Sequence, residues 1–269
     1  MSIKIARSEA RSLLRSAKVS PLRFTLLYLG IRLLFDLIRT GLNSMTDPLP
    51  AIDPTTLQPD DLLDFYAALF PSRTPAGWTV LFVSVLISLL IWVLSAGYKC
   101  YCLGTARGGE MPYESLFDGF SFVGKVLGLT LLLGFLIAFG VTLFFVPGVI
   151  FFLMYRFAFY NLCADPSIGI LTAMKRSRLQ TDGRKLEILS LELSFLPLLL
   201  LALVLETVGT WLLDPLLPVT LAGNLIYALC SSLLLYSVSM FLTPYRELSF
   251  ALYFLSLPQT EPPAGPSDI

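Results

Sequence analysis

The chain has no histidine and few charged residues. Asp, Glu, Lys and Arg make up 14% of its 269 residues, whereas soluble domains carry about a quarter. The missing histidine excludes Ser–His–Asp and Cys–His catalysis, histidine zinc sites and histidine-ligated haem. Basic and acidic residues are equal in number, 19 of each, so no basic excess indicates nucleic acid. We expect no enzyme activity, no metal or other cofactor, and no nucleic-acid partner.

Cysteine is also scarce. The four cysteines are Cys100, Cys102, Cys163 and Cys230. The Cys100-x-Cys102 spacing is neither a thioredoxin pair nor a zinc pair, and no second pair accompanies it. A free cysteine in a membrane helix usually acts as a small apolar residue. We therefore interpret the four cysteines as packing residues.

Long apolar runs dominate the sequence, which is 55% hydrophobic with a mean hydropathy of +0.76. A helix needs about 20 apolar residues to cross a bilayer. Five segments qualify: Trp78–Ala96, Val126–Val146, Val149–Cys163, Leu186–Leu213 and Leu221–Leu242. A sixth, Leu22–Leu42, is marginal because Arg32 and Asp36 roughly cancel the contribution of its apolar residues. The sequence predicts an all-α, polytopic transmembrane bundle of about six spans, forming one domain over residues 1–269.

The distribution of charge favours six crossings. Basic residues fill the N-terminal segment 1–21 and the connections before the third and fifth spans, whereas segment 43–77 holds five aspartates and one arginine. Basic loops stay on the cytoplasmic side of a membrane. Six crossings place every basic cluster on that side and the acidic loop on the other. Both termini are then cytoplasmic, and the proline-containing tail 259–269 is expected to be disordered.

The connections carry local signals of their own. Asp60–Leu69 and Tyr113–Phe122 are typical of short amphipathic helices at the membrane surface. A turn is expected at Pro147–Gly148. Asp165–Pro166 favours a helix start, with Asp as N-cap and Pro at the first position, and Gly183 favours that helix's end.

Arg156 is the strongest candidate for a functional residue. It lies midway along the short span Val149–Cys163, too deep for its guanidinium to reach water easily. A charge at that depth usually faces the bundle interior or a wet cavity and has a partner. Glu192, Asp36 and Glu206 are the candidate partners. The alternative is a structural ion pair that fixes helix packing, or a different register of the span.

Two further pairs of charges lie inside predicted spans. Glu192 and Glu206 are 14 positions apart, which places them nearly on one helix face and could line a path with Arg156. Both could instead reach the headgroups, and Pro197 could bend the span between them. Arg32 and Asp36 are spaced i, i+4, so we expect a structural ion pair that neutralises both charges.

The N-terminal basic residues form a separate feature. Arg7, Arg11, Arg15 and Lys18 fall on one face of a predicted helix. Such a face attracts anionic lipid by about 1 kcal/mol per basic residue. The same residues also set orientation, and the two roles are compatible.

A set of short motifs resembles a known family. The motifs are Val-Pro-Gly-Val-Ile at 146–150, Tyr-Arg at 155–156, Asp-Pro at 165–166, Ala-Met-Lys-Arg-Ser at 173–177, and Leu-Glu-Leu-Ser-Phe at 191–195. Their order from Gly97 onward resembles domain of unknown function 975, a bacterial membrane family without an assigned activity. It is more loosely similar to the membrane domain of some glycerophosphodiester phosphodiesterases, whose catalytic domain this sequence lacks. The resemblance implies a multi-span protein of the bacterial plasma membrane.

Two hypotheses for function follow. The first is a membrane protein that binds or moves a lipid-like or anionic solute, with Arg156, Glu192 and Glu206 as ligand-binding residues and anionic headgroups as partners. The second is a non-catalytic accessory or scaffold protein that binds a partner membrane protein. A cavity around Arg156 would favour the first hypothesis, and dry packing against Glu192 or Asp36 the second.

Overall fold

A computed structural model describes residues 3–16, 20–44, 75–143, 145–218 and 220–258. Lys18, most of the acidic loop, the predicted helix at 60–69 and the tail 259–269 lie outside this part of the chain. The described residues form helices and short connections, without a strand among them. The all-α class predicted from the sequence is confirmed.

Five apolar segments are long enough to cross a membrane. They comprise α4 (Pro75–Ala106); η1 (Tyr113–Phe122) with α5 (Val123–Leu143); α6 (Phe145–Met154) with α7 (Ala158–Ala164); α9 (Lys185–Leu193), α10 (Leu196–Leu213) and η2 (Asp214–Leu216); and α11 (Leu221–Leu255). These segments correspond to the five unambiguous spans predicted from hydropathy. The chain is therefore a multi-pass helical membrane protein.

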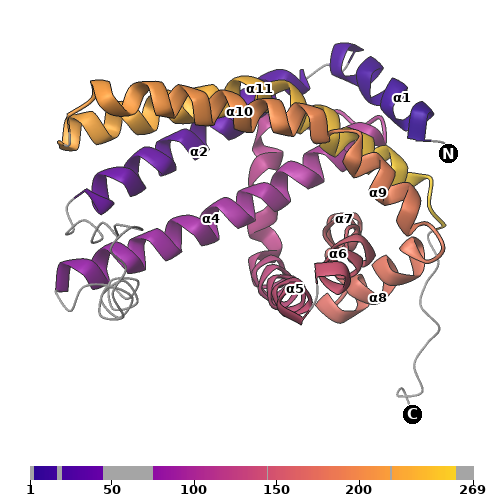
Figure 1. Cartoon of the computed structure of the whole chain (residues 1–269). Helices are drawn as coiled ribbons and strands as arrows, with labels where there is room; N and C mark the ends of the chain where they lie inside the picture. Colours follow the sequence, from indigo (N-terminus) through magenta and orange to yellow (C-terminus); the bar gives the residue numbers. More distant parts are fainter. Residues whose placement is uncertain (1–2, 17–19, 45–74, 144, 219, 259–269) are drawn as a thin grey trace.

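The expected sixth span is α2 (Pro21–Asn43), which is outside that set. Its charges, Arg23, Arg32, Asp36 and Arg39, lower its hydropathy. It nevertheless runs alongside α11, as Figure 1 shows, and also packs against α4. Near its start, the ring of Phe24 stacks on Tyr101 of α4 with 3.6 Å between centroids. Full crossing by α2 stays a prediction, but the helix is packed with the others.

Two predicted spans are interrupted. Turn residues Tyr155–Phe157 separate α6 from α7, and Ser194–Phe195 separate α9 from α10. The long helix α11 contains a third irregular point, because Pro244 lies inside it. Proline removes one backbone hydrogen bond of a helix and bends it. These three points position the polar residues described below.

The connections differ from the predictions in instructive ways. The turn expected at Pro147–Gly148 lies inside α6, where a Cβ at Gly148 would collide with the backbone of Val141 in α5. Asp165 ends α7 and accepts hydrogen bonds from Ser167, which lower the pKa of its carboxyl. Helix α8 (Ile170–Thr181) starts after Gly169 instead. Gly183, at φ +70°, does follow the end of α8, as predicted.

The core is built around the second half of α11. Leu248, Phe250 and Phe254 are completely buried there, and Phe254 packs on Tyr160 of α7. Helix α1 (Ile3–Ser16) packs against the same half of α11 through Ala6 and Ala10, which have no exposed surface. Figure 1 shows α1 beside the end of α11 that lies away from α2. A basic helix is thereby fixed onto the transmembrane bundle.

One covalent link was missed by the sequence analysis. Cys100 of α4 and Cys163 of α7 form a disulfide, 63 residues apart in the chain. Cys102 and Cys230 are free. A separation of that length carries no local motif, so the interpretation of all four cysteines as packing residues was wrong for this pair.

Candidate functional site

Arg156 lies at the break between α6 and α7, and Glu192 is its partner. The Arg156 Nε donates a hydrogen bond of 2.8 Å to Glu192 Oε1. Their side chains are 8% and 12% exposed. Arg156 is therefore buried inside the bundle, and it is paired with one of its three candidate partners.

Two residues of α11 complete this charge cluster. Arg246 contacts both carboxylate oxygens of Glu192, at 2.8 and 3.0 Å. Glu247 lies 3.6 Å from the guanidinium groups of both Arg156 and Arg246, and it accepts a 2.7 Å hydrogen bond from Tyr160. Two arginines and two glutamates therefore balance each other beside Pro244.

The cluster is packed rather than open. The Arg156 guanidinium lies 4.1 Å from the centroid of the Phe250 ring, and its Nη2 is buried without a hydrogen-bond partner. A buried cation already flanked by two carboxylates has little attraction left for an added anion. The geometry favours the alternative in which Arg156 fixes helix packing, because the cluster joins the interrupted spans to α11.

Glu206 lies elsewhere, on α10, and the ion pairs of Arg156 involve Glu192 and Glu247. Fourteen residues separate Glu206 from Glu192, and the turn at Ser194–Phe195 interrupts the helix along which the two were aligned. A path lined by both residues stays a prediction.

Asp36 pairs with a different residue from the one expected. Its carboxylate lies 3.8 Å from Arg39 and accepts a 2.5 Å hydrogen bond from Tyr236 of α11. The Arg32 guanidinium lies instead over the rings of Tyr28 and Tyr236, 5.9 Å from each centroid. Helical side chains lean toward the N-terminus, so an acid is better placed before its base than after it. Arg32 leans toward Tyr28, and Arg39 toward Asp36.

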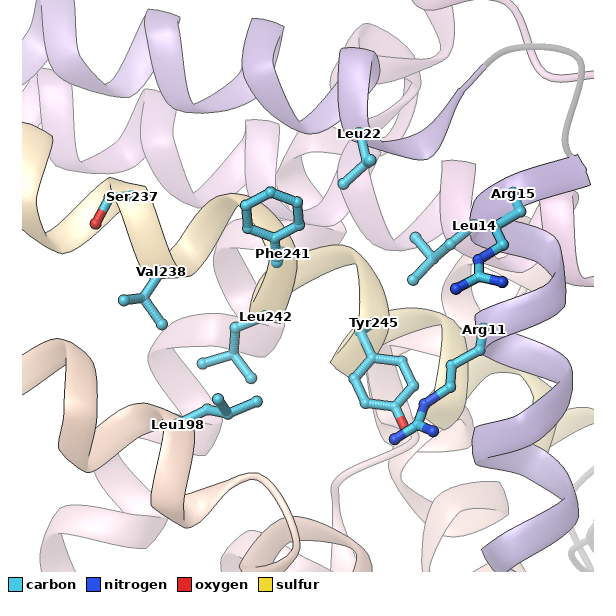
Figure 2. A pocket seen from close by; sticks show the side chains of 10 residues that line it. All are labelled: Arg11, Leu14, Arg15, Leu22, Leu198, Ser237, Val238, Phe241, Leu242 and Tyr245. Atoms are coloured by element: carbon cyan, nitrogen blue, oxygen red, sulfur yellow. The ribbon is translucent and has the colours of Figure 1, made fainter.

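A groove lies between α1, α2, α10 and α11 and has a volume of about 700 Å³. Figure 2 shows its lining, with Arg11, Leu14 and Arg15 on the α1 side and Leu198 on the opposite side. Between them lie residues of α11: Ser237, Val238, Phe241, Leu242 and Tyr245. The groove is basic at one end and apolar along the rest.

Tyr245 organises the basic end of this groove. Its hydroxyl accepts a 3.0 Å hydrogen bond from Arg7 Nε, and the Arg11 guanidinium lies 5.4 Å from its ring centroid. Within the described part of the chain, Arg11 and Arg15 have no carboxylate partner. Of the four predicted lipid-contact residues, Arg7 and Arg11 contact this tyrosine, Arg15 lines the same groove, and Lys18 is outside the described residues.

The groove lies at one end of three apolar helices. Leu22 opens α2, Leu198 lies near the start of α10, and Leu242 closes the predicted span in α11. The charge pattern assigns these three helix ends to the same side of the membrane. Leu198 and Phe241 are 40% and 61% exposed, so the apolar part of the groove is continuous with the outer surface of the bundle.

Sequence reasoning missed three residues of these two regions: Tyr245, Arg246 and Glu247. The hydropathy of α11 falls after Leu242, so the predicted span ended before them. The available signal was Pro244 followed by Tyr-Arg-Glu, because a helix that continues past a proline needs tertiary packing to hold it.

No group of three or more Cys, Asp or Glu residues suited to a metal ion occurs in the described ranges. Comparison of the chain with protein-family models, curated proteins and solved structures finds no match. The resemblance to the bacterial membrane family stays a prediction, and function must be argued from the geometry of this chain.

Proposed function

We propose that the protein binds one anionic phospholipid in the groove between α1, α10 and α11. The carrying observation is a single groove of about 700 Å³ with two arginines at one end and leucine, valine and phenylalanine along the rest. Neither arginine has a carboxylate partner among the residues that the structure describes. The headgroup phosphate contacts Arg11 and Arg15. An acyl chain lies along Leu198, Val238 and Phe241. The cationic and apolar parts match the two halves of such a lipid.

The proposal includes an orientation. The membrane is the plasma membrane, both termini are cytoplasmic, and the groove faces the cytoplasmic leaflet. That leaflet holds the anionic lipids that attract basic residues near a membrane surface. Both the positions of the basic segments and the position of the groove at the α2, α10 and α11 ends support this arrangement.

Selectivity must come from the headgroup. An acyl chain is as well solvated by neighbouring lipid as by the leucines of a groove. Each basic residue contributes about 1 kcal/mol near an anionic surface. The arginines therefore distinguish an anionic lipid from a neutral one, and the apolar lining determines where the bound lipid lies.

Native mass spectrometry of the purified protein tests the proposal with phosphatidylglycerol against phosphatidylcholine. We expect Arg11→Gln and Arg15→Gln each to weaken phosphatidylglycerol retention by about fivefold, which corresponds to about 1 kcal/mol. Arg178→Gln, an exposed arginine of α8, is the matched control and leaves retention unchanged. Equal retention by all four proteins would contradict the proposal.

A second variant tests the apolar part without changing charge. Leu198→Trp places an indole in the groove from a partly exposed position, so folding is preserved. We expect loss of the retained lipid with an unchanged unfolding temperature. Retention of a partner protein in place of lipid, unaffected by this variant, would favour the accessory role instead.

A further inference from the structure

A second, smaller hollow adjoins the basic end of the groove. This basic recess has a volume of about 210 Å³ and is lined by Lys4, Arg7, Ser8, Arg11 and Tyr245. It shares Arg11 and Tyr245 with the groove. The two hollows are therefore neighbours around one tyrosine, and a molecule at Arg11 can extend into both.

The basic recess differs from the groove in chemistry. Ligand pockets usually have about 300–1,000 Å³, so a hollow of about 210 Å³ holds a compact group rather than an acyl chain. Three of its five lining side chains are cationic, the other two carry a hydroxyl, and none is acidic. A small anionic group is the complementary occupant.

The spacing of the basic residues explains why one phosphate does not satisfy them. Lys4, Arg7, Arg11 and Arg15 recur every three or four positions and share one face of α1. Like charges at this spacing destabilise a helix. In the described chain none of the four forms a salt bridge, and the hydrogen bond of Arg7 goes to a neutral tyrosine. Phosphate at Arg11 and Arg15 leaves Lys4 and Arg7 uncompensated.

We infer that the preferred ligand carries two phosphate groups, one between Arg11 and Arg15 and the other in the basic recess with Lys4 and Ser8. This inference rests on the proposed lipid groove and names its substrate class. Two lipid types share that chemistry: a two-chain lipid with a terminal phosphate monoester, and a four-chain lipid with two phosphodiesters joined through glycerol. In both lipids a short polar linker separates the two phosphates. This linker would lie at Arg11 and Tyr245, which line both hollows.

The test compares three lipids on the intact protein by native mass spectrometry. The probes are phosphatidylglycerol, phosphatidylglycerol phosphate and cardiolipin. We expect wild type to retain at least one two-phosphate lipid about fivefold better than phosphatidylglycerol, since a further basic residue is engaged. Preference for phosphatidylglycerol phosphate identifies a monoester in the recess, and preference for cardiolipin identifies a diester.

Lys4→Gln is the decisive variant because Lys4 is exposed and lines only the recess. It should abolish the preference for two phosphates and leave phosphatidylglycerol retention unchanged. Lys175→Gln, an exposed lysine of α8, is the matched control. Equal retention of all three lipids, still lost in Arg11→Gln, would overturn this inference and leave the proposed function standing. Retention that no variant of Arg11 or Arg15 changes would overturn both.

Discussion

Arg156 illustrates how a single buried charge is stabilised in this bundle. Its guanidinium contacts Glu192 directly and lies near Glu247. Arg246 is close to the same two carboxylates and balances the second negative charge. Removing one member of a buried ion pair leaves an uncompensated charge, whereas removing both restores neutrality. We therefore expect Arg156 to control stability rather than ligand retention.

We predict that Arg156→Met lowers the free energy of unfolding by about 3–5 kcal/mol. The double variant Arg156→Met/Glu247→Gln should recover part of that loss, because it returns the cluster to neutrality. Thermal unfolding in detergent measures both effects, and phosphatidylglycerol retention serves as the control. Normal stability of Arg156→Met, together with lost lipid, would show that Arg156 binds ligand directly.

At the level of residues, the sequence predicted the burial of charged side chains better than it predicted their ion-pair and hydrogen-bond partners. Charge inside an apolar run indicated that Arg156 is buried, and the presence of Glu192 in a neighbouring span made it a candidate partner. Glu247 and Tyr160 could not be recognised, because their contact joins positions 87 residues apart. Such pairing depends on how helices cross, which hydropathy does not contain.

At the level of elements, the long apolar helices were predictable, and their interruptions were predictable only in part. Five runs of sufficient length fixed the spans to within several residues, except that α4 and α11 continue well past Ala96 and Leu242. Pro197, which was expected to bend the fifth span, lies in the first turn of α10, two residues after the break at Ser194–Phe195. Glu192 precedes the break and belongs to the charge cluster, and Glu206 follows it in α10.

Helix α2 offers a test at this scale. Tyr236 of α11 donates a hydrogen bond to Asp36 of α2, and its ring lies beside Arg32. Hydrogen bonds to charged groups contribute about 1.5–3 kcal/mol. We predict that Tyr236→Phe lowers the free energy of unfolding by about that amount. Tyr227→Phe, on the same helix, is the control, and equal unfolding curves for the two variants would show that this contact does not hold α2.

At the level of the whole molecule, orientation is the main consequence of the charge pattern. We predict six crossings with both termini in the cytoplasm, because basic segments flank α2, α5 and α10 on one side. Single cysteines introduced at position 2 and in the loop 45–74, in a variant lacking the native cysteines, are labelled with a membrane-impermeant maleimide in intact cells. Only the loop should react. Labelling at position 2 would show that the orientation is the opposite of the predicted one.

The disulfide provides an independent observation on orientation. Cys100 lies past the predicted inner end of its span, and Cys163 is in the last turn of α7. Disulfides are rare in the cytosol. If the charge pattern determines orientation, this pair should be reduced in intact cells and oxidise after purification, and the thiol content of the two preparations distinguishes these states.

The proposed lipid site is the groove between α1 and α11, which we expect to hold an anionic lipid. The most direct measurement is an experimental structure of the protein in nanodiscs of phosphatidylglycerol and phosphatidylcholine, compared with phosphatidylcholine alone. We predict lipid density with its phosphate at Arg11 and Arg15 and a chain along Leu198 and Phe241 in the first sample only. An empty groove in both samples, or equal density in both, would contradict it.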